Sequence, residues 1–292
     1  MTGLSESHPL QRPLSRRRRL AGAISATLVW VAVAVAVIPL LLVMFTVVKK
    51  GGSLITPRFL TDDLPIQARS AEGGVGPAVT GTLLITGVAS LIAIPIGILA
   101  AIYLTEYGGT NRLARVIRFL SDVMAGVPSI VMGLFIFTVW VVRYQQRSGL
   151  AGSLALACLM LPIVIRSSEA MIRLVPNELR EASYALGSRK ARTVLTVVLP
   201  AALPGVVSGC LLAVARAAGE TAPLLFTIGL TYSKNLKLSG ENTALSAQIF
   251  SNASTSFVAA QQRAWAAALT LIVIVLILSV VARVVAARFT VR

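Results

Sequence analysis

Two ionisable side chains stand out because they lie within a long apolar stretch of the sequence. Arg216 and Glu220 come about 17 and 21 residues after Leu199, in a run that extends to about residue 230. An arginine at the centre of a membrane span costs roughly 2.5–3.5 kcal/mol, and a spacing of four places both side chains on one helix face, where they can pair. The planar guanidinium can also donate two hydrogen bonds to one oxyanion. The pair is therefore either a structural ion pair or part of a path that anions contact.

Long apolar segments are the elements that would position this pair. Of the 292 residues, 56% are hydrophobic and 13% are charged, and this charged fraction is about half that of a soluble domain. A run of about 20 apolar residues is long enough to cross a bilayer. Six runs meet this criterion, over approximately residues 20–48, 76–104, 116–142, 150–172, 199–230 and 264–285. The sequence therefore predicts an all-α membrane protein with six transmembrane helices.

The basic residues indicate which way these helices cross the membrane. The formal net charge is +16, which in a soluble protein would favour nucleic-acid binding, but here the charges lie in the short connections that set membrane topology. With the N-terminus inside, 17 Lys and Arg residues fall in inner segments and nine in outer segments, while Arg216 lies within a span. This bias predicts a multi-pass protein of the bacterial plasma membrane, with both termini cytoplasmic and no nucleic-acid partner.

The spans divide the chain into four parts. Residues 1–19 form a polar cytoplasmic N-terminus, and residues 20–72 hold the first span and an outer loop. The first apolar run is much longer than the roughly 7–15 residues of a secretory signal, so we expect it to be retained. Residues 73–285 form a core with five spans, and residues 286–292 form a cytoplasmic C-terminus.

An amphipathic segment lies on the inner side between the fourth and fifth spans. It begins at Pro176 and Asn177, which are helix-start signals, and Gly187 is a helix-stop signal. Apolar residues recur at helical spacing between these signals, among charged ones. The sequence therefore predicts a short cytoplasmic helix over about residues 177–187. Its pattern alone fits equally a helix lying on anionic lipid and a helix docked into the groove of a partner.

This inner helix carries a resemblance to a known motif. The segment is similar to the EAA motif of ABC-importer permeases, whose pattern here reads Glu181-Ala182-Ser183, three residues, Gly187, nine residues, and Val197-x-Leu199-Pro200. Ser183 and Val197 stand where that pattern has alanine and isoleucine. The resemblance implies a coupling helix seated in a cleft of a cytoplasmic ATPase. The residues to which it assigns ATPase coupling are Arg180, Glu181, Ala182 and Gly187.

Three other segments are similar to the permeases of phosphate importers, in particular those of the PstA type. They are residues 73–82 (GGVGPAVTGT), 125–134 (AGVPSIVMGL) and 216–227 (RAAGETAPLLFT). The continuation APLL after GET favours the PstA type over the companion permease. Together with the EAA segment, the resemblance covers about residues 73–230. It implies the helical bundle of a type I ABC importer permease, with Arg216, Glu220 and Thr221 on the substrate path.

The resemblance also implies partners and a mechanism. The chain would form a heterodimer with a second permease subunit and would work with two copies of a cytoplasmic ATPase, which bind the ATP. An extracytoplasmic phosphate-binding protein would deliver inorganic phosphate. The path through the lipid bilayer would open alternately to the two sides as the ATPases close and reset.

Other ionisable groups lie near the inner ends of the spans. Asp122 falls in the third apolar run, and Arg166 and Glu169 are three residues apart in the fourth. We expect these three groups to be interfacial rather than in contact with substrate.

The motifs of enzymes are missing from the sequence. It contains no G-x-x-x-x-G-K-[ST], no H-E-x-x-H and no G-x-S-x-G. His8 is the only histidine, and Cys158 and Cys210 are isolated from each other, so we expect no metal site. The prediction is a non-catalytic permease without a cofactor of its own.

Two other transport functions remain alternatives to an ATP-driven phosphate importer. The chain could be a permease for another oxyanion, such as sulfate or molybdate, or an ion-driven carrier independent of ATP.

Overall fold

The computed structural model describes residues 16–70, 72–109 and 111–288, which form helices and connecting segments. In this part of the chain, five helices are long and apolar enough to cross a membrane, and a bent pair of helices makes a sixth span if it is counted as one. The five cover Arg16–Leu54, Gly76–Tyr107, Gly149–Arg173, Lys190–Gly219 and Val258–Val281. The prediction of an all-α membrane fold is confirmed.

Helix α1 (Arg16–Gly51) contains the first predicted span and, up to Lys49, belongs to a compact unit separate from the rest of the chain. The helix continues through Pro39 without interruption. Its apolar residues lie on all sides, which suits a helix surrounded by lipid. The predicted N-terminal segment lies outside the described residues as far as residue 15, and the predicted C-terminal segment lies outside them from residue 289 onward.

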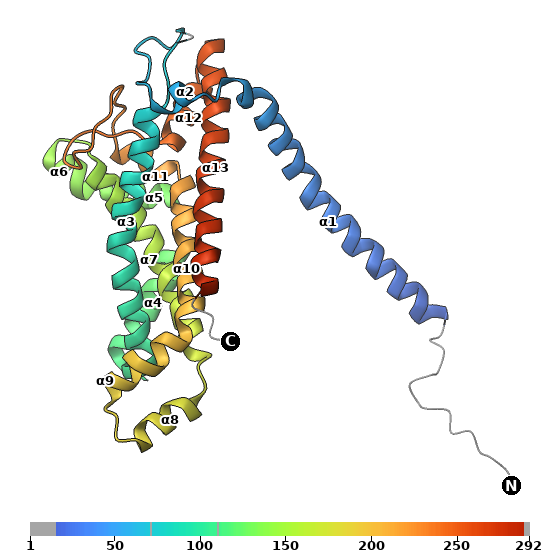
Figure 1. Cartoon of the computed structure of the whole chain (residues 1–292), viewed down its shortest axis with the longest axis vertical. Helices are drawn as coiled ribbons and strands as arrows, with labels where there is room; N and C mark the ends of the chain where they lie inside the picture. Colours follow the sequence, from blue (N-terminus) through green and yellow to red (C-terminus); the bar gives the residue numbers. More distant parts are fainter. Residues whose placement is uncertain (1–15, 71, 110, 289–292) are drawn as a thin grey trace. The chain divides into compact units, whose positions relative to one another are not determined.

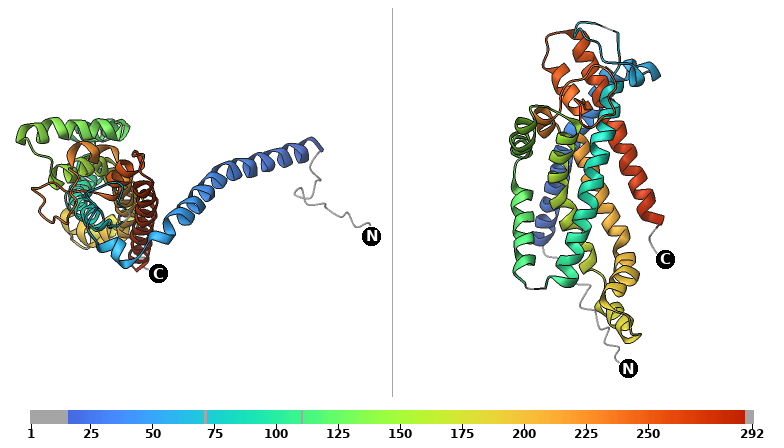
Figure 2. Two further views of the ribbon diagram at one scale, coloured as in Figure 1. Left: turned by 90° about the horizontal axis from the view of Figure 1, so that it is seen from above. Right: turned by 90° about the vertical axis from the view of Figure 1, so that its left-hand side faces the viewer.

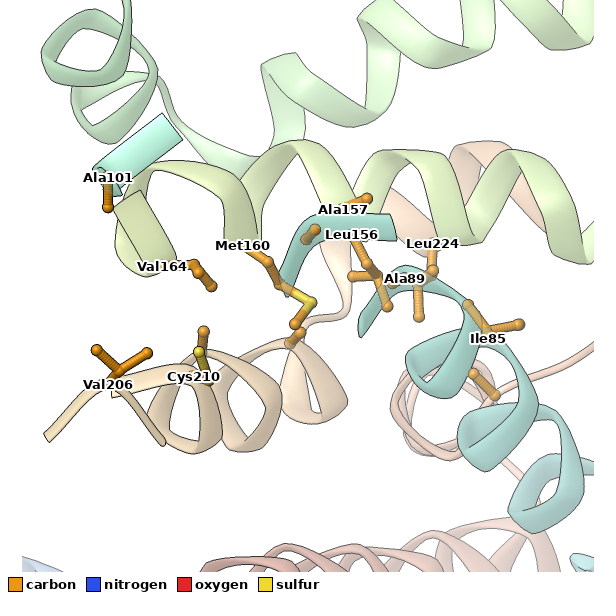
Figure 3. Packing of buried hydrophobic residues seen from close by; sticks show 14 of the residues in the cluster. Ile85, Ala89, Ala101, Leu156, Ala157, Met160, Val164, Val206, Cys210 and Leu224 are labelled. Atoms are coloured by element: carbon orange, nitrogen blue, oxygen red, sulfur yellow. The ribbon is translucent and has the colours of Figure 1, made fainter. Parts of the chain in front are cut away.

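The second unit, from Lys50 onward, is a helical bundle built around α7 (Gly149–Arg173). Helix α7 packs most extensively against α3 (Gly76–Ile102) and next against α10 (Leu199–Gly219). These helices and α13 (Val258–Arg288) run side by side in Figures 1 and 2. The buried side chains between α3, α7 and α10 are small or medium-sized and apolar, as Figure 3 shows for Ala89, Met160 and Cys210. This core fixes the position of α10, which carries Arg216 and ends one residue before Glu220.

Two glycines allow α10 to approach α7 closely. Gly205 lies against the side chain of Met171, and Gly209 lies against Ser167. A Cβ atom on either glycine would overlap these neighbours. Small residues spaced by four are a common way for membrane helices to come into contact.

The third predicted span is broken near its middle. Helices α4 (Arg112–Gly126) and α5 (Ser129–Ile136) are separated by Val127 and Pro128, and the axes on the two sides of the break differ by 107°. A proline disfavours helical backbone in the residue before it, and Val127 is accordingly extended, with φ −73° and ψ 129°. The span predicted as continuous over 116–142 is therefore two helices joined by a sharp bend.

The fifth predicted span also differs from its expected limits. One continuous helix covers Lys190–Gly219 instead of the predicted 199–230. Pro223 explains the earlier end, because in an uninterrupted helix its ring would clash with the carbonyl group four residues before it. The chain is extended at Glu220 and becomes helical again in α11 (Ala222–Thr227).

The remaining elements gather mainly at the two ends of the bundle (Figure 1). At one end, called the α12 end below, lie α2 (Pro57–Thr61) and α12 (Leu245–Ala253). At the opposite end, called the α8 end, lie α8 (Asn177–Ala185) and α9 (Lys190–Thr193). The short elements that complete the described chain are η2 (Gly52–Leu54), η3 (Tyr103–Tyr107), η4 (Phe137–Val141), α6 (Val142–Tyr144) and η5 (Val194–Val198). Of these, η3, η4 and η5 are π-helical turns within or at the ends of longer helices.

Candidate functional site

The charged pair lies at the break in a helix rather than in the helix interior. Arg216 is in the last turn of α10, and Glu220 is the first residue beyond it. Nε of Arg216 lies 3.6 Å from Oε1 of Glu220, which is close enough for an ion pair but too long for a good hydrogen bond. The side chain of Arg216 is 70% exposed, whereas that of Glu220 is 18% exposed. A guanidinium has five N–H donors, so this one long contact leaves most of its capacity for another anion.

The backbone at this break is held in place by hydrogen bonds. The hydroxyl of Ser246, in α12, donates to the carbonyl of Glu220 at 2.8 Å. The amide of Glu220 donates to the carbonyl of Ala217 at 3.2 Å, and the carbonyl of Thr221 accepts from the amide of Leu224 at 3.1 Å. Thr221 itself is half-buried. The break is thus an ordered feature that fixes where the charged pair stands.

One face of α10 is left uncovered by the described chain. Ser208, Leu212 and Arg216 are spaced by four, share this face and are exposed. A groove of about 440 Å³ runs along the same helix toward α13, lined by Ser208, Leu211, Leu212, Ala215, Ser279 and Arg283. Arg216 therefore stands at the end of an open face that includes both polar and apolar side chains.

At the α8 end, Arg180 is directed into the chain and not outward. Its Nη2 and Nε donate to Oε1 of Glu106 at 2.9 and 3.2 Å. Nη1 also donates to the carbonyl of Val175 at 2.6 Å, and Nη2 to the carbonyl of Ile172 at 3.1 Å. The side chains of Arg180 and Glu106 are only 14% and 5% exposed. Arg180 therefore attaches α8 to the ends of α7 and α3.

The outer face of α8 carries the other residues assigned to coupling. Glu181 and Ala182 are exposed, and so are two leucines, Leu179 and Leu186, the second of them 88% exposed. Gly187 follows with φ +78°, a left-handed conformation that favours glycine and stops the helix. The helix thus presents an apolar and acidic surface away from the bundle.

Ser183, which replaces an alanine of the EAA pattern, has a partner of its own. Its hydroxyl lies 2.9 Å from that of Thr193 in α9, and both residues are buried. The bond ties α8 to the helix that continues into α10. The substitution is therefore matched by a hydroxyl on the neighbouring element.

Two buried carboxylates lie at this end, and of these Glu169 was singled out from the sequence but Glu106 was not. Glu106 pairs with Arg180, and Glu169 accepts from Nε of Arg118 at 3.0 Å and from Nη2 of Arg173 at 2.6 Å. The side chain of Glu169 is 6% exposed, so it is covered by the protein, and its place at the membrane interface stays a prediction. A signal was present in the sequence, because each acid stands near the inner end of a span among an excess of arginines.

Asp122 and Arg166, the other two groups expected to be interfacial, form an ion pair with each other. Their side chains are 57% and 43% exposed. This pair joins α4 to α7 at the rim of the bundle.

Comparison with solved structures defines the class to which this fold belongs. A chain of the methionine ABC transporter MetNI, in an inward-facing conformation, matches with a TM-score of 0.63 at 20% identity, over 74% of this chain and 96% of that chain. A chain of an amino acid ABC transporter with histidines matches with a TM-score of 0.54 at 20% identity, over 73% and 94%. At this identity the likeness is one of fold. It confirms the bundle of a type I ABC importer permease.

Comparisons with other sequences show the family of the chain, which a likeness of fold alone does not show. Residues 93–291 match the family described as binding-protein-dependent transport system inner membrane component. The chain is 45% identical over 271 residues to the phosphate transport system permease protein PstA 1 of Mycobacterium tuberculosis (strain CDC 1551 / Oshkosh), covering 90% of this chain and 88% of that protein. It is 42% identical over 249 residues to PstA of Yersinia pestis, covering 85% and 84%. The chain therefore belongs to the family of binding-protein-dependent inner membrane components, in the group of PstA permeases.

Proposed function

We propose that this chain is the PstA-type permease subunit of an ATP-driven importer of inorganic phosphate. Its partners would be a second permease subunit, two copies of a cytoplasmic ATPase, and an extracytoplasmic phosphate-binding protein. The proposal draws on the names of the relatives, which are phosphate transport system permeases. The observation that carries it is the exposed guanidinium of Arg216 at an ordered helix break.

The chemistry of this break suits an oxyanion. Membrane transporters commonly bind ions where a helix is interrupted, because the chain there offers polar groups that a continuous helix uses internally. Arg216 supplies a planar donor that can form two hydrogen bonds to phosphate. Glu220, at 3.6 Å, holds the guanidinium loosely while no anion is present. Thr221 adds a hydroxyl beside the pair.

The uncovered face of α10 supports assembly with a second permease. An arginine that is 70% exposed is costly against lipid but not in a water-filled path between two subunits. The adjoining exposed Leu212 would then contact the other subunit. In the proposed arrangement, the path lies between the two permeases and is lined by Arg216, Glu220 and Thr221.

The exposed face of α8 supports coupling to an ATPase. A short helix that projects exposed leucines from the end of the bundle fits the general mode in which a helix lays its apolar side into a partner's groove. In the proposed mechanism, closure of the ATPases moves α8, and alternating access follows in the bundle. The attachments that would carry the movement are Arg180 to Glu106, toward α3, and Ser183 to Thr193, toward α10.

Uptake of labelled phosphate into vesicles that contain the assembled importer tests this function. We expect Arg216→Ala to reduce the rate of ATP-dependent uptake at least tenfold, because losing a charge-assisted contact costs about 1.5–3 kcal/mol. Arg115→Ala is a matched control, since Arg115 is an exposed arginine of α4 away from the α10 face. Normal uptake by Arg216→Ala would show that this residue does not act on the substrate.

The same assay separates the alternative substrates and energy sources. For a phosphate importer, excess unlabelled phosphate should abolish uptake of the label, while sulfate and molybdate should not. Uptake should require ATP and should survive the collapse of ion gradients. Uptake that follows an ion gradient without ATP would instead indicate an ion-driven carrier.

A further inference from the structure

A polar recess lies at the α8 end, at the base of α8. It measures about 330 Å³ and is lined by side chains from η3, α7, α8 and α9, including Glu106, Arg173, Asn177, Arg180, Tyr184 and Lys190. All six of these side chains are polar or charged. A recess of this kind suits a small charged ligand better than an apolar one.

Positive charge exceeds negative charge around this recess. Glu106 is already bound by Arg180. Glu169 does not line the recess, and its Oε1 is shared by Arg118 and by Arg173, which does line it. Two carboxylates therefore form ion pairs with three arginines. Arg173 retains a side chain that is 59% exposed and can donate to another group.

Lys190 adds a further cation without a carboxylate partner. Its Nζ lies 5.1 Å from the centre of the Tyr107 ring, and it forms no salt bridge with a carboxylate of the described residues. A cation–π contact leaves the charge of the ammonium in place. The recess and its immediate surroundings thus hold about two positive charges more than negative ones.

We propose that this recess binds a phosphate group. Lys190 and Arg173 would neutralise its charge, because both side chains bind phosphate oxygens well. The amide NH₂ of Asn177 and the hydroxyl of Tyr184 would complete its hydrogen bonds. Inorganic phosphate and the headgroup of a phospholipid offer the same chemistry. The site lies at the α8 end, apart from Arg216, and does not rest on the transport function.

Such a ligand would bridge elements that otherwise meet only through a few contacts. It would join the end of α7, the face of α8 that turns toward the bundle, and the start of α9. Its binding would therefore reduce the opening motions of α8 relative to the bundle. This predicts a local effect on backbone hydrogen exchange in residues 174–190.

The test is hydrogen–deuterium exchange of the purified full chain in phospholipid-free detergent, with and without inorganic phosphate. We expect phosphate to slow exchange in residues 174–190, while chloride at equal ionic strength does not. Lys190→Gln should raise the phosphate concentration for half-maximal protection about tenfold, which corresponds to one charged contact. Arg192→Gln is a matched control on the same short helix, since Arg192 does not line the recess. Lys190→Arg should keep the protection, which separates loss of the ligand from misfolding.

A second arm identifies the source of the phosphate group. If a lipid headgroup is the natural ligand, discs that contain phosphatidic acid should protect the segment without added phosphate, and Lys190→Gln should remove that protection. Either source supports the site. The proposed site would be overturned if the ligand protected residues 174–190 equally in the wild type and in Lys190→Gln. It would also be overturned if Lys190→Gln and Arg192→Gln weakened this protection equally.

Discussion

The buried ion pair between Arg180 and Glu106 is the residue-scale feature on which the attachment of α8 depends. Removal of Arg180 would leave the carboxylate of Glu106, which is 5% exposed, without its cation. The loss of one member of a buried pair typically costs about 3–5 kcal/mol. We therefore expect Arg180→Ala to lower the midpoint of thermal unfolding in detergent well below that of the wild type.

A double variant distinguishes a lost ion pair from a general loss of packing. Arg180→Met with Glu106→Leu replaces both charges by apolar side chains, so no buried charge is left unpaired. The double variant should lose less free energy of unfolding than the sum of the losses caused by Arg180→Met alone and Glu106→Leu alone. The exposed Arg115 provides a control, because Arg115→Ala should change stability by no more than about 0.5 kcal/mol. If the losses in free energy of unfolding of the two single variants simply added up in the double variant, the ion pair between Arg180 and Glu106 would be contradicted.

The hydroxyl pair of Ser183 and Thr193 gives a second residue-scale prediction. Ser183→Ala should destabilise the chain by about 1–3 kcal/mol, because it leaves the hydroxyl of Thr193 buried without this partner. Ser183→Ala combined with Thr193→Val should recover most of that loss, since both polar groups are then gone. Thermal unfolding of the three variants provides the measurement. A double variant that is less stable than Ser183→Ala alone would show that the two hydroxyls do not act as a pair.

Only part of this residue-scale detail could be predicted from the sequence. The left-handed backbone of Gly187 follows from local chemistry, because glycine stops a helix in this way. The pairings of Glu106 with Arg180 and of Glu169 with Arg118 do not, because these partners lie 74 and 51 residues away in the chain, whereas Arg173, the other partner of Glu169, is four residues away in the same helix. Pairs between residues so far apart in the sequence depend on how the helices pack, which a local sequence pattern does not determine.

At the scale of elements, prolines show the same limit. Pro39, Pro95, Pro162 and Pro204 lie inside helices that continue, whereas Pro128 and Pro223 accompany breaks. All six looked alike as prolines within apolar runs. At the break before Pro223, another part of the chain supports the interrupted backbone, because the hydroxyl of Ser246 in α12 donates to the carbonyl of Glu220. Hydropathy thus predicted the approximate positions of the spans, but it did not predict the interruptions within two of them.

Two glycines of α3 provide a matched test of packing between elements. A Cβ atom at Gly81 would overlap the backbone carbonyl of Thr243, in the segment that leads into α12, whereas Gly87 faces open space in this chain. Gly81→Ala should therefore cost about 1–3 kcal/mol or displace that segment, because backbone atoms cannot move aside cheaply. Gly87→Ala should be neutral or stabilising, since alanine is the better helix former.

Thermal unfolding of the two variants, compared with the wild type, checks this prediction. The substitutions are the same and lie in the same helix, so a difference between them reports the contact with Thr243 and not helix propensity. If the two variants unfolded at the same temperature, the close approach of α3 and the segment before α12 would be contradicted.

At the scale of the whole molecule, the bundle has two chemically different ends. The α8 end carries an arginine-rich network with two buried carboxylates, in Glu106 and Glu169. The opposite end contains α2, α12 and several connecting segments, one of which bonds to the start of α7: the carbonyls of Leu238 and Gly240 accept from the amides of Leu150 and Gly149. The excess of Lys and Arg on one side predicts that the α8 end is cytoplasmic.

Cysteine labelling can decide this orientation. In a background with Cys158→Ala and Cys210→Ala, two exposed small residues are changed singly: Ala185→Cys, in α8, and Ser239→Cys, between the two residues that bond to the start of α7. Because α7 is long enough to span the membrane, these positions must lie on opposite sides of it. A membrane-impermeant maleimide should label Ser239→Cys in intact spheroplasts, but Ala185→Cys only after permeabilisation. The cysteine-free background should stay unlabelled throughout. The reverse pattern would contradict the orientation alone, whereas labelling of both positions from the outside would contradict the crossing of α7 itself.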